Sequence, residues 1–236
     1  MNSMTTKNKD NHPVHVGLIL DGNRRWAKQN NLETIEGHRQ GYLNLRRIVK
    51  AAKKHDIEYI SAYVFSNENW RRGKDEVKNL MKLFLWILKH EVNEISKEGI
   101  RLRVIGSKVR IGKALVKAIH DAEEKTKNND KGTLLLCLDY GGQQEIVEAT
   151  KKIIKSGVSP EDITPELIAE NLDAPEVPPL DLIIRTSGEQ RLSNFMLWES
   201  AYSELFFVNK LWPDFTEANF DSVIRKYKKI KRNFGK

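Results

Sequence analysis

Three segments of this sequence place arginines and small polar residues directly after an apolar run. The first reads LILDGNRRWA, in which Asp21 and Gly22 follow the run and Arg24 and Arg25 come next. Guanidinium groups match phosphate oxygens, and a carboxylate beside a phosphate suits Mg²⁺, which bridges the two. This segment predicts a metal-assisted phosphate site, although a plain turn in which Asp21 caps the next helix fits the same residues.

The second segment reads FSNENWRR and carries Ser66, Asn67 and Asn69 after an apolar stretch, followed by Arg71 and Arg72. By itself it is better explained as a capped helix start with solvated arginines. Like the first segment, however, it is polar and cationic and follows a strand-like run, so it is a second candidate for the site.

The third segment reads IIRTSGEQRLSNF. Arg185 ends an apolar run, Arg191 follows six residues later, and Ser187 and Ser193 stand near them. Two arginines around a loop of glycine and serine outline a clamp for a diphosphate. The alternative is a surface loop with ion pairs, for example between Glu189 and one of the arginines.

Several other chemistries are disfavoured by what the sequence lacks. It contains neither a GxxxxGK[ST] run nor a GxGxxG run after a strand, so a P-loop nucleotidase and a dinucleotide-binding fold are not expected. The six histidines show no HxxxH metal spacing, and His38, at the start of a predicted helix, could face the Asp21 site. The one cysteine, Cys137, excludes an intramolecular disulfide and is predicted to be a buried apolar residue.

Strand-like and helix-like patterns alternate along the chain. The expected strands are residues 14–20, 57–65, 100–105, 133–138, 181–184 and 204–208. The expected helices are residues 42–52, 76–98, 109–127, 143–155 and 216–231, with a loop and one short helix over 156–180. This order predicts an α/β fold with a central six-stranded, mainly parallel sheet flanked by helices. We expect a flexible N-terminus over residues 1–13 and a single domain over residues 14–236.

The carboxyl ends of parallel strands meet at one edge of a sheet, so the three polar segments are expected to converge there. Their arginines and one or two carboxylates predict a site for two phosphorylated ligands. Beside it lies the helix predicted for 76–98, which carries Met81, Phe84, Trp86 and Leu88. That stripe is either ordinary core or one wall of an apolar tunnel, and its period fits both.

The formal charge of +8 comes almost entirely from residues 225–236, which hold seven Lys and Arg and no acid. Cations are favoured at the end of a helix, so this segment is explained without a nucleic-acid partner, and none is expected. The longest unbroken apolar run is residues 83–88, and the polar start lacks the apolar core of a secretory signal. We therefore expect a cytoplasmic protein.

At these residues the sequence resembles the cis-prenyltransferases, the family of undecaprenyl diphosphate synthase. The matching blocks, in order, are HVGLILDGNRRWA, EGHRQG, YVFSNENWRR, LDYGGQQEIV, DLIIRTSGEQRLSNFMLWESAYSELFF and LWPDF. The resemblance implies a homodimer, a parallel six-stranded sheet, and an apolar tunnel between the sheet and the helices at 38–54 and 76–98. It implies a Mg²⁺-dependent enzyme that adds isopentenyl diphosphate to an allylic diphosphate, with farnesyl diphosphate as the expected starter. The product would be a Z-polyprenyl diphosphate such as undecaprenyl diphosphate, a lipid-carrier precursor.

The resemblance also implies roles for individual residues. Asp21 matches the Mg²⁺-linked aspartate, and Glu204 matches a glutamate that completes the metal environment around the dimer interface. The residues that match the allylic diphosphate site are Gly22, Asn23, Arg24, Arg25, Trp26 and His38. Those that match the mobile loop near the reacting carbons are Ser66, Asn69, Trp70 and Arg72, with Glu76 after them. Those that match the isopentenyl diphosphate site are Arg185, Arg191 and Ser193. Asn69 is the candidate for assisting proton removal.

The sequence departs from the family pattern at several places. Arg24 stands where many bacterial members have glycine, and Thr34 stands where many have an arginine that touches the allylic diphosphate, so Arg24 is a candidate substitute. Val64 and Leu138 occupy tunnel positions that are often alanine in long-chain enzymes, and larger side chains there would shorten the product. Asn233 interrupts the RxG pattern near the C-terminus.

Two alternatives stay open at this point. One is a short-chain Z-prenyl diphosphate synthase, which Val64 and Leu138 favour. The other is a non-catalytic partner subunit of a heteromeric enzyme, although such subunits lose the strand-end aspartate and the substrate-binding arginines that this chain keeps. A long apolar product would also bring the protein into peripheral contact with a membrane surface.

Overall fold

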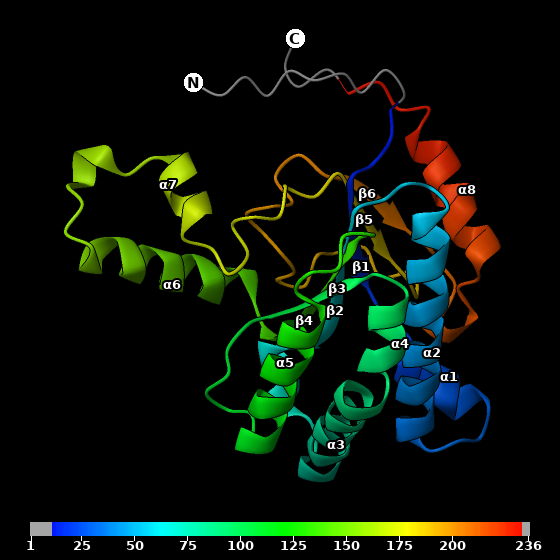
Figure 1. Cartoon of the computed structure of the whole chain (residues 1–236). Coiled ribbons are helices and arrows are strands. Elements are labelled where there is room, and N and C mark those ends of the chain that lie inside the picture. The colour runs from blue at the N-terminus through cyan, green and yellow to red at the C-terminus, as the bar shows by residue number, and fades with distance from the viewer. Residues whose placement is uncertain (1–10, 233–236) are drawn as a thin grey trace.

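A sheet of parallel strands forms the centre of the protein. The structure is a computed structural model, and it describes residues 11–232. The strands in this range are β1 (His15–Ile19), β2 (Tyr59–Ser66), β3 (Arg101–Ile105), β4 (Thr133–Tyr140), β5 (Leu182–Arg185) and β6 (Glu204–Phe207). They lie side by side in the order β3-β4-β2-β1-β5-β6, and every neighbouring pair is parallel (Figure 1).

Helices connect the strands. The α-helices are α1 (Asn23–Gln29), α2 (Thr34–Lys53), α3 (Lys74–His90), α4 (Val92–Lys97), α5 (Lys113–Thr126), α6 (Gly142–Lys155), α7 (Pro165–Glu170) and α8 (Glu217–Tyr227). Short 3₁₀ helices occur at η1 (Asn67–Arg71), η2 (Pro160–Asp162) and η3 (Trp212–Asp214).

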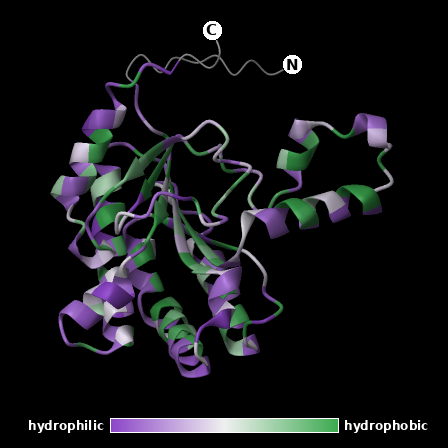
Figure 2. Cartoon of the chain, turned by 180° about the vertical axis from the view of Figure 1, so that it is seen from behind, coloured by the Kyte–Doolittle hydropathy of each residue, from purple (hydrophilic) through white to green (hydrophobic). Residues whose placement is uncertain are grey.

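The sheet is buried on both faces, because apolar side chains alternate between the two sides of each strand. Val16 and Leu18 of β1 belong to the larger core, together with side chains of α2, α3, α5 and α8. On the opposite face, Ile19 and Ile183 pack with Phe195 and Met196, which belong to the segment after β5. Figure 2 shows the result as mainly hydrophobic strands enclosed by helices that are banded with hydrophilic residues.

The helices α6 and α7 form an arm that projects away from the body of the protein (Figures 1 and 2). On α6, Val147 and Ile154 remain 46% and 66% exposed. These two residues are among the large apolar side chains that the described chain leaves exposed.

The fold class predicted from the sequence is confirmed, and the sheet is parallel throughout. Cys137 is buried in β4, as predicted. The helix predicted for 42–52 begins earlier, at Thr34, and the helix considered after Asp21 is the short α1, whose N-cap Gly22 has no side-chain cap. Of the predicted N-terminal segment 1–13 only residues 11–13 are described, and Asn233 lies outside the described residues. No helix within residues 11–232 is both long enough and apolar enough to pass through a membrane.

The single helix predicted for residues 76–98 is wrong, because the chain forms two helices, α3 and α4, that meet at Glu91. Glu91 has a φ of −100° and ends α3. Its carboxylate accepts a hydrogen bond from Arg46 of α2 at 2.8 Å. Directly after this break, Val92 is buried in the core, where it is 7% exposed. A periodic apolar pattern continues across this break and therefore conceals it.

The order of the strands identifies where a ligand site belongs. β1 lies between β2 and β5, and the chain runs from β1 to β2 on one side and from β5 to β6 on the other. The connections after β1 and β5 diverge, which leaves a crevice outside the carboxyl ends of these two strands. The segments that follow β1 and β5 begin at Leu20 and Thr186, so the first and third polar segments meet there.

We predict that His15 makes the fold sensitive to acid. Its ring lies 2.7 Å from the carbonyl oxygen of Pro178 and 2.8 Å from the Ser61 hydroxyl, and burial lowers its pKa to about 4. In the unfolded chain His15 binds a proton near pH 6.5, whereas in the folded protein it binds one only near pH 4. Protonation therefore favours the unfolded chain, and the free energy of unfolding decreases as the pH falls from 6.5 towards 4. Between pH 6.5 and 4.5 this loss amounts to about 2 kcal/mol.

Urea unfolding at these two pH values tests the prediction. His15→Asn should lose about 2 kcal/mol less than the wild type over this range, whatever its stability at pH 6.5. His120→Asn is the matched control, because the His120 side chain is 75% exposed. An equal pH dependence in His15→Asn and the wild type would contradict the assignment.

Candidate active site

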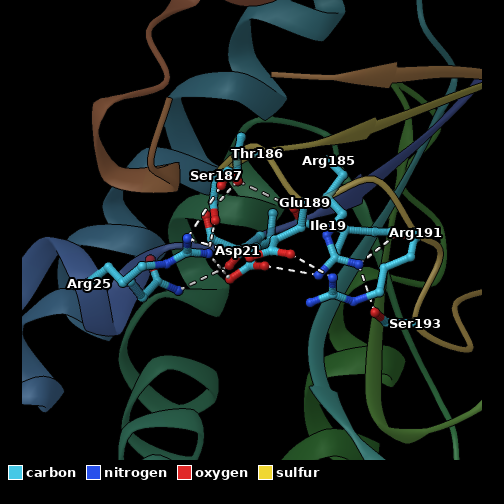
Figure 3. Close-up of polar contacts among 11 residues, drawn as sticks. Ile19, Asp21, Arg25, Arg185, Thr186, Ser187, Glu189, Arg191 and Ser193 are labelled. Carbon is cyan, nitrogen blue, oxygen red and sulfur yellow. Dashed lines mark hydrogen bonds and ion pairs between the residues drawn. The ribbon is translucent and has the colours of Figure 1, made fainter. Parts of the chain in front are cut away.

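The carboxylate of Asp21 lies between two arginines at the carboxyl end of β1 (Figure 3). Its Oδ2 accepts a hydrogen bond from Arg185 at 2.9 Å, and its Oδ1 accepts one from Arg25 at 3.3 Å. Its carbonyl oxygen accepts hydrogen bonds from the Thr186 hydroxyl at 2.6 Å and from the Trp212 amide at 3.0 Å. The backbone is therefore fixed, while the side chain keeps 28% of its surface exposed to a ligand.

Gly22 allows the tight turn between β1 and α1. Its φ is 115°, a conformation that favours glycine, and a Cβ there would lie only 2.9 Å from the Cα of Leu211. The turn places Asn23, Arg24 and Arg25 at the start of α1. The Oδ1 of Asn23 is buried and has no hydrogen-bond partner among the described residues, although the residue lines a cavity. This atom lies against Gly41 of α2, where a Cβ would collide with it.

Arg185 is the buried centre of the site. It is the last residue of β5, and its side chain is only 5% exposed. Its Nη1 donates to the Ser193 hydroxyl at 2.7 Å and to the carbonyl oxygen of Arg191 at 2.5 Å. Its Nε is buried and has no hydrogen-bond partner in residues 11–232. The Arg185 guanidinium thus holds the loop after β5 in place, and its Nε remains as a donor for an anion.

The loop after β5 adopts a backbone conformation that most residues avoid. Ser187 and Gly188 both have a φ of 79°, and Ser193 and Asn194 have φ values of 50° and 66°. Such conformations cost about 1–3 kcal/mol for residues other than glycine and concentrate at ligand sites. Arg25 supports the loop from α1, because it donates to the Ser187 hydroxyl and, at 3.4 Å, to the Ser187 carbonyl oxygen.

Arg191 is the exposed arginine of this loop, with 60% of its side chain accessible. It pairs with Glu189 at 2.5 Å, and Glu189 also lies 3.7 Å from Arg25. The ion pair that the sequence left open as an alternative is therefore present. Because the pair is exposed it is weak, and a more highly charged phosphate ligand would displace it.

Glu76, in the first turn of α3, lies close to basic side chains from three other segments. Its Oε1 lies 3.3 Å from Arg72, 3.7 Å from Arg24 and 3.9 Å from the Nε2 of His38. Burial lowers the pKa of His38 to about 4, assisted by the charges of Arg72 and Arg24. The imidazole is therefore neutral at pH 7, and its contact with Glu76 is not an ion pair.

The second polar segment forms the 3₁₀ helix η1. The amide of Ser66 donates to the Oδ1 of Asn69 at 3.2 Å, which caps the start of this helix. The capped helix start considered from the sequence is therefore present. Ser66, Asn69 and Arg72 nevertheless line the same cavity as Asp21, so the segment also belongs to the site. Trp70 points elsewhere, and its Nε1 donates to Asp139 at 2.8 Å.

A cavity of about 620 Å³ begins at these polar groups. The predicted site residues that line it are Asp21, Asn23, His38, Ser66, Asn69, Arg72, Arg185 and Ser193. Its walls are mainly apolar and come from the sheet and from α2 and α3, and Val64 and Leu138 are among them. It reaches Ile100 and Leu134, near the amino ends of β3 and β4. A molecule with an anionic head and a long apolar tail matches this arrangement.

Apart from Glu204, six predicted site residues are not among those that line the cavity. They are Gly22, Arg24, Arg25, Trp26, Trp70 and Arg191. Trp26 has a structural contact, because its Nε1 donates to Asp214 at 2.8 Å and so ties α1 to η3.

Glu204 lies far from Asp21 within one chain. Phe207 pairs with Arg185 at the carboxyl end of the sheet, whereas Glu204 pairs with Leu182, three positions back along the strand. At roughly 3.3 Å per residue this separates Glu204 from the site by about 10 Å along the strand. A single chain therefore does not place both carboxylates around one metal ion.

Sequence reasoning missed the contacts of three residues at this site. Glu76 was only noted as following the second segment, and its pairing with three basic groups depends on the packing of α1, α2 and α3. Arg110 and Asp139, which contact Trp70, were not singled out. Arg110 follows β3 by five residues, but no motif in the sequence links it to Trp70 or Asp139, and these contacts arise only from packing.

The donor set fits Mg²⁺ held jointly by the protein and a phosphorylated ligand. Among the described residues there is no group of three or more His, Cys, Asp and Glu that could enclose a metal ion. Mg²⁺ is commonly held by one or two carboxylates together with substrate phosphates and water. Asp21, exposed at the cavity mouth and surrounded by arginines, provides such a carboxylate.

Comparison with known proteins agrees with this geometry. A family model described as putative undecaprenyl diphosphate synthase matches residues 19–235. An isoprenyl transferase of Thermotoga maritima is 45% identical over 225 residues, which cover 94% of this chain and 97% of the relative. The ditrans,polycis-undecaprenyl-diphosphate synthase of Haemophilus ducreyi, described as (2E,6E)-farnesyl-diphosphate specific, is 45% identical and 95% of each chain is covered.

Solved structures are similar over the whole fold. The crystal structure of lavandulyl diphosphate synthase from Lavandula x intermedia, in complex with dimethylallyl diphosphate, has a TM-score of 0.91 and 35% identity. It covers 96% of this chain and 99% of that chain. A probable undecaprenyl diphosphate synthase from Campylobacter jejuni has a TM-score of 0.82 and 31% identity, with 95% and 99% covered.

We predict that the two arginines of the third segment differ in what they contribute to stability. Arg185→Ala should lower the free energy of unfolding by about 2–3 kcal/mol, because it leaves Asp21 without its buried partner. Arg191→Ala should change it by less than about 0.5 kcal/mol, because Arg191 is exposed. Both variants should bind inorganic diphosphate more weakly than the wild type. Denaturant unfolding and calorimetric titration measure the two effects, and equal destabilisation by both variants would contradict the assignment.

Proposed function

Because this chain belongs to the undecaprenyl diphosphate synthase family of prenyltransferases, we propose that it condenses isopentenyl diphosphate with an allylic diphosphate. The resemblance given by the sequence motifs is thereby confirmed at the level of the family. The observation that carries the proposal is the position of Asp21, Arg25 and Arg185 at the polar end of a long apolar cavity. The anionic head of a prenyl diphosphate would bind these groups, and its chain would enter the cavity.

Two diphosphates need two sets of donors, and the site offers two. We assign the allylic diphosphate to the start of α1, where Asn23, Arg24 and Arg25 lie, with neutral His38 beside it. We assign isopentenyl diphosphate to Arg185, Arg191 and Ser193 after β5. Asp21 lies between the two sets, so a ligand in either place exchanges partners with its carboxylate.

The arginines would stabilise the charge that develops on the departing diphosphate as the bond to the allylic carbon breaks. Mg²⁺, held by Asp21 together with the substrate phosphates, would supply additional stabilisation of that charge. The double bond of isopentenyl diphosphate attacks the allylic carbon, and a proton then leaves the new chain. A carboxamide is a weak base, so Asn69 would orient the reacting carbon while the released diphosphate accepts the proton.

We propose that the working enzyme is a homodimer. The outer edge of β6 has no strand beside it among the described residues, and Leu205 on this strand is 44% exposed. The arm formed by α6 and α7 also exposes apolar side chains. A second copy that covers these surfaces would provide its own Glu204 near the metal ion, which one chain does not place there.

The decisive test is incorporation of labelled isopentenyl diphosphate with Mg²⁺ and, separately, dimethylallyl, geranyl and farnesyl diphosphates. We expect a ladder from farnesyl diphosphate that ends at a long polyprenyl diphosphate. Asp21→Ala should lower turnover by about a thousandfold, because it removes the metal-linked carboxylate.

Asp121→Ala is the matched control, since this aspartate is 57% exposed on α5 and does not line the cavity. Substantial Mg²⁺-dependent turnover by Asp21→Ala would contradict the metal assignment. Absence of incorporation with every starter, from a folded dimer, would contradict the function and favour the partner-subunit alternative.

A short-chain product is the second candidate, and two observations favour it. Val64 and Leu138 line the cavity, where they occupy space that an elongating chain would need. The similar structure of lavandulyl diphosphate synthase contains dimethylallyl diphosphate, which is a short allylic molecule. The measured product length decides between the two candidates.

We predict that Val64→Ala and Leu138→Ala shift the product distribution towards longer chains, and that the double variant shifts it furthest. Each substitution removes apolar atoms from the cavity wall and so increases the space for the chain. Val116→Ala is the control, because Val116 packs against the core without lining the cavity. Chromatography of the products measures the shift, and an unchanged distribution in the double variant would contradict a limiting role for these residues.

The proposed location is the cytoplasm, with peripheral contact to a membrane surface. The support is the chemistry of a long polyprenyl product, which is insoluble in water and must leave for a lipid phase. Retention of the protein on lipid vesicles only in the presence of its product would agree with this proposal.

A further inference from the structure

A buried carboxylate beneath η1 is not used by the proposed mechanism. The side chain of Asp139, near the end of β4, has an exposure of 0%. Its Oδ1 accepts a hydrogen bond from the Trp70 indole at 2.8 Å, and its Oδ2 accepts one from the Nε of Arg110 at 3.2 Å. The Nη2 of Arg110 also donates to Oδ1. A buried polar group needs hydrogen-bond partners, and Trp70 and Arg110 together supply donors to both oxygens of Asp139.

Arg110 holds η1 through more than this ion pair. Its Nη2 donates to the Oδ1 of Asn67 at 3.3 Å, and its guanidinium group lies over the Trp70 ring, 5.2 Å from the ring centre. Arg110 belongs to the loop between β3 and α5, which is far from η1 in the sequence. The first residue of η1 and its fourth residue are therefore both bound by one side chain.

Trp70 connects this contact to the reacting end of the site. It is next to Asn69 and two residues from Arg72, and both of those residues line the cavity. Its ring packs edge-on against Phe65, with the ring centres 5.3 Å apart. The backbone of Trp70 belongs to η1 while its ring is bound by Asp139 and Arg110, so these contacts restrain the position of this short helix.

We propose that Arg110 and Asp139 are positioning residues that clamp Trp70, and through it hold Asn69 and Arg72 in the orientation needed for the condensation. Neither clamp residue lines the cavity, so both act through η1. The inference rests on the proposed function, because the benefit of the clamp lies in the geometry of that reaction. Misplacement of a reacting group by about 1 Å can cost about a hundredfold in rate.

Hydrogen exchange and steady-state kinetics on Arg110→Ala test the clamp. We expect the amides of residues 66–72 to exchange about tenfold faster than in the wild type, with those of β4 unchanged. We expect kcat to fall by about tenfold to a hundredfold. The KM for the allylic diphosphate should stay within about twofold, because the groups assigned to its diphosphate remain. Lys108→Ala, an exposed change of the same charge two positions earlier, is the control for both measurements.

Two conservative variants separate positioning from general stability. Arg110→Lys keeps the charge but loses the planar fork that reaches both Asp139 and Asn67, and Asp139→Asn keeps an acceptor for Trp70 but loses the charge. Each should lie between the wild type and Arg110→Ala in exchange and in kcat. If Arg110→Ala does not fold, hydrogen exchange and kcat are measured on these two variants instead.

The proposal is overturned if residues 66–72 exchange at the wild-type rate in the folded variants, or if faster exchange leaves kcat unchanged. Failure of the proposed function is a different result, because the wild type itself would then incorporate no isopentenyl diphosphate. The exchange experiment uses no substrate, so it reports on the clamp in either case.

Discussion

The buried ion pair between Asp21 and Arg185 is the interaction on which the site depends. It joins the ends of β1 and β5, the two neighbouring strands after which the chain turns in opposite directions. Arg185 is almost completely buried, so it needs a permanent partner when no ligand is bound. Asp21 needs one less strongly, because part of its side chain faces the cavity mouth. The two charges therefore neutralise each other in the free protein. Under the proposed function, a diphosphate would take the place of Asp21 beside Arg185, and Mg²⁺ would take the place of Arg185 beside Asp21, so neither charge would be left alone.

The rest of the site combines charged groups at the cavity mouth with apolar walls behind them. Arginines from α1, η1 and the loop after β5 surround its mouth, and Glu76 offsets Arg24 and Arg72. His38 stays neutral because it is buried among these cations, so it adds a hydrogen-bonding group without further positive charge. The apolar walls begin directly behind these groups. Under the proposed function, this sharp change from charged to apolar lining would orient a prenyl diphosphate with its head at the sheet edge and its tail between the sheet and α2 and α3.

Short apolar runs followed by polar residues made the convergence of Asp21 and Arg185 predictable, because parallel strands bring their carboxyl ends to one edge. The same reasoning could not find the break at Glu91, where no glycine or proline interrupts the apolar period. It could not find the positive φ of Ser187 either, since serine gives no signal for that conformation. Arg110 was hidden for a different reason. Its role arises only when a loop after β3 packs on the helix after β2, and local sequence does not record such contacts.

A single chain does not bring Glu204 close to Asp21. The sequence motif connects it with Asp21, yet the register of β6 places it at the other end of the strand. The motif and the register agree if a second copy approaches along the open edge of β6. Each chain would then place its Glu204 near the Asp21 site of the other chain. The exposed apolar side chains of α6 are on the arm that such a copy could reach, and they would be covered by the same association. Under the proposed dimer, catalysis and assembly are therefore coupled, since a monomer would keep Asp21 and the arginines but lack the second carboxylate for the metal ion.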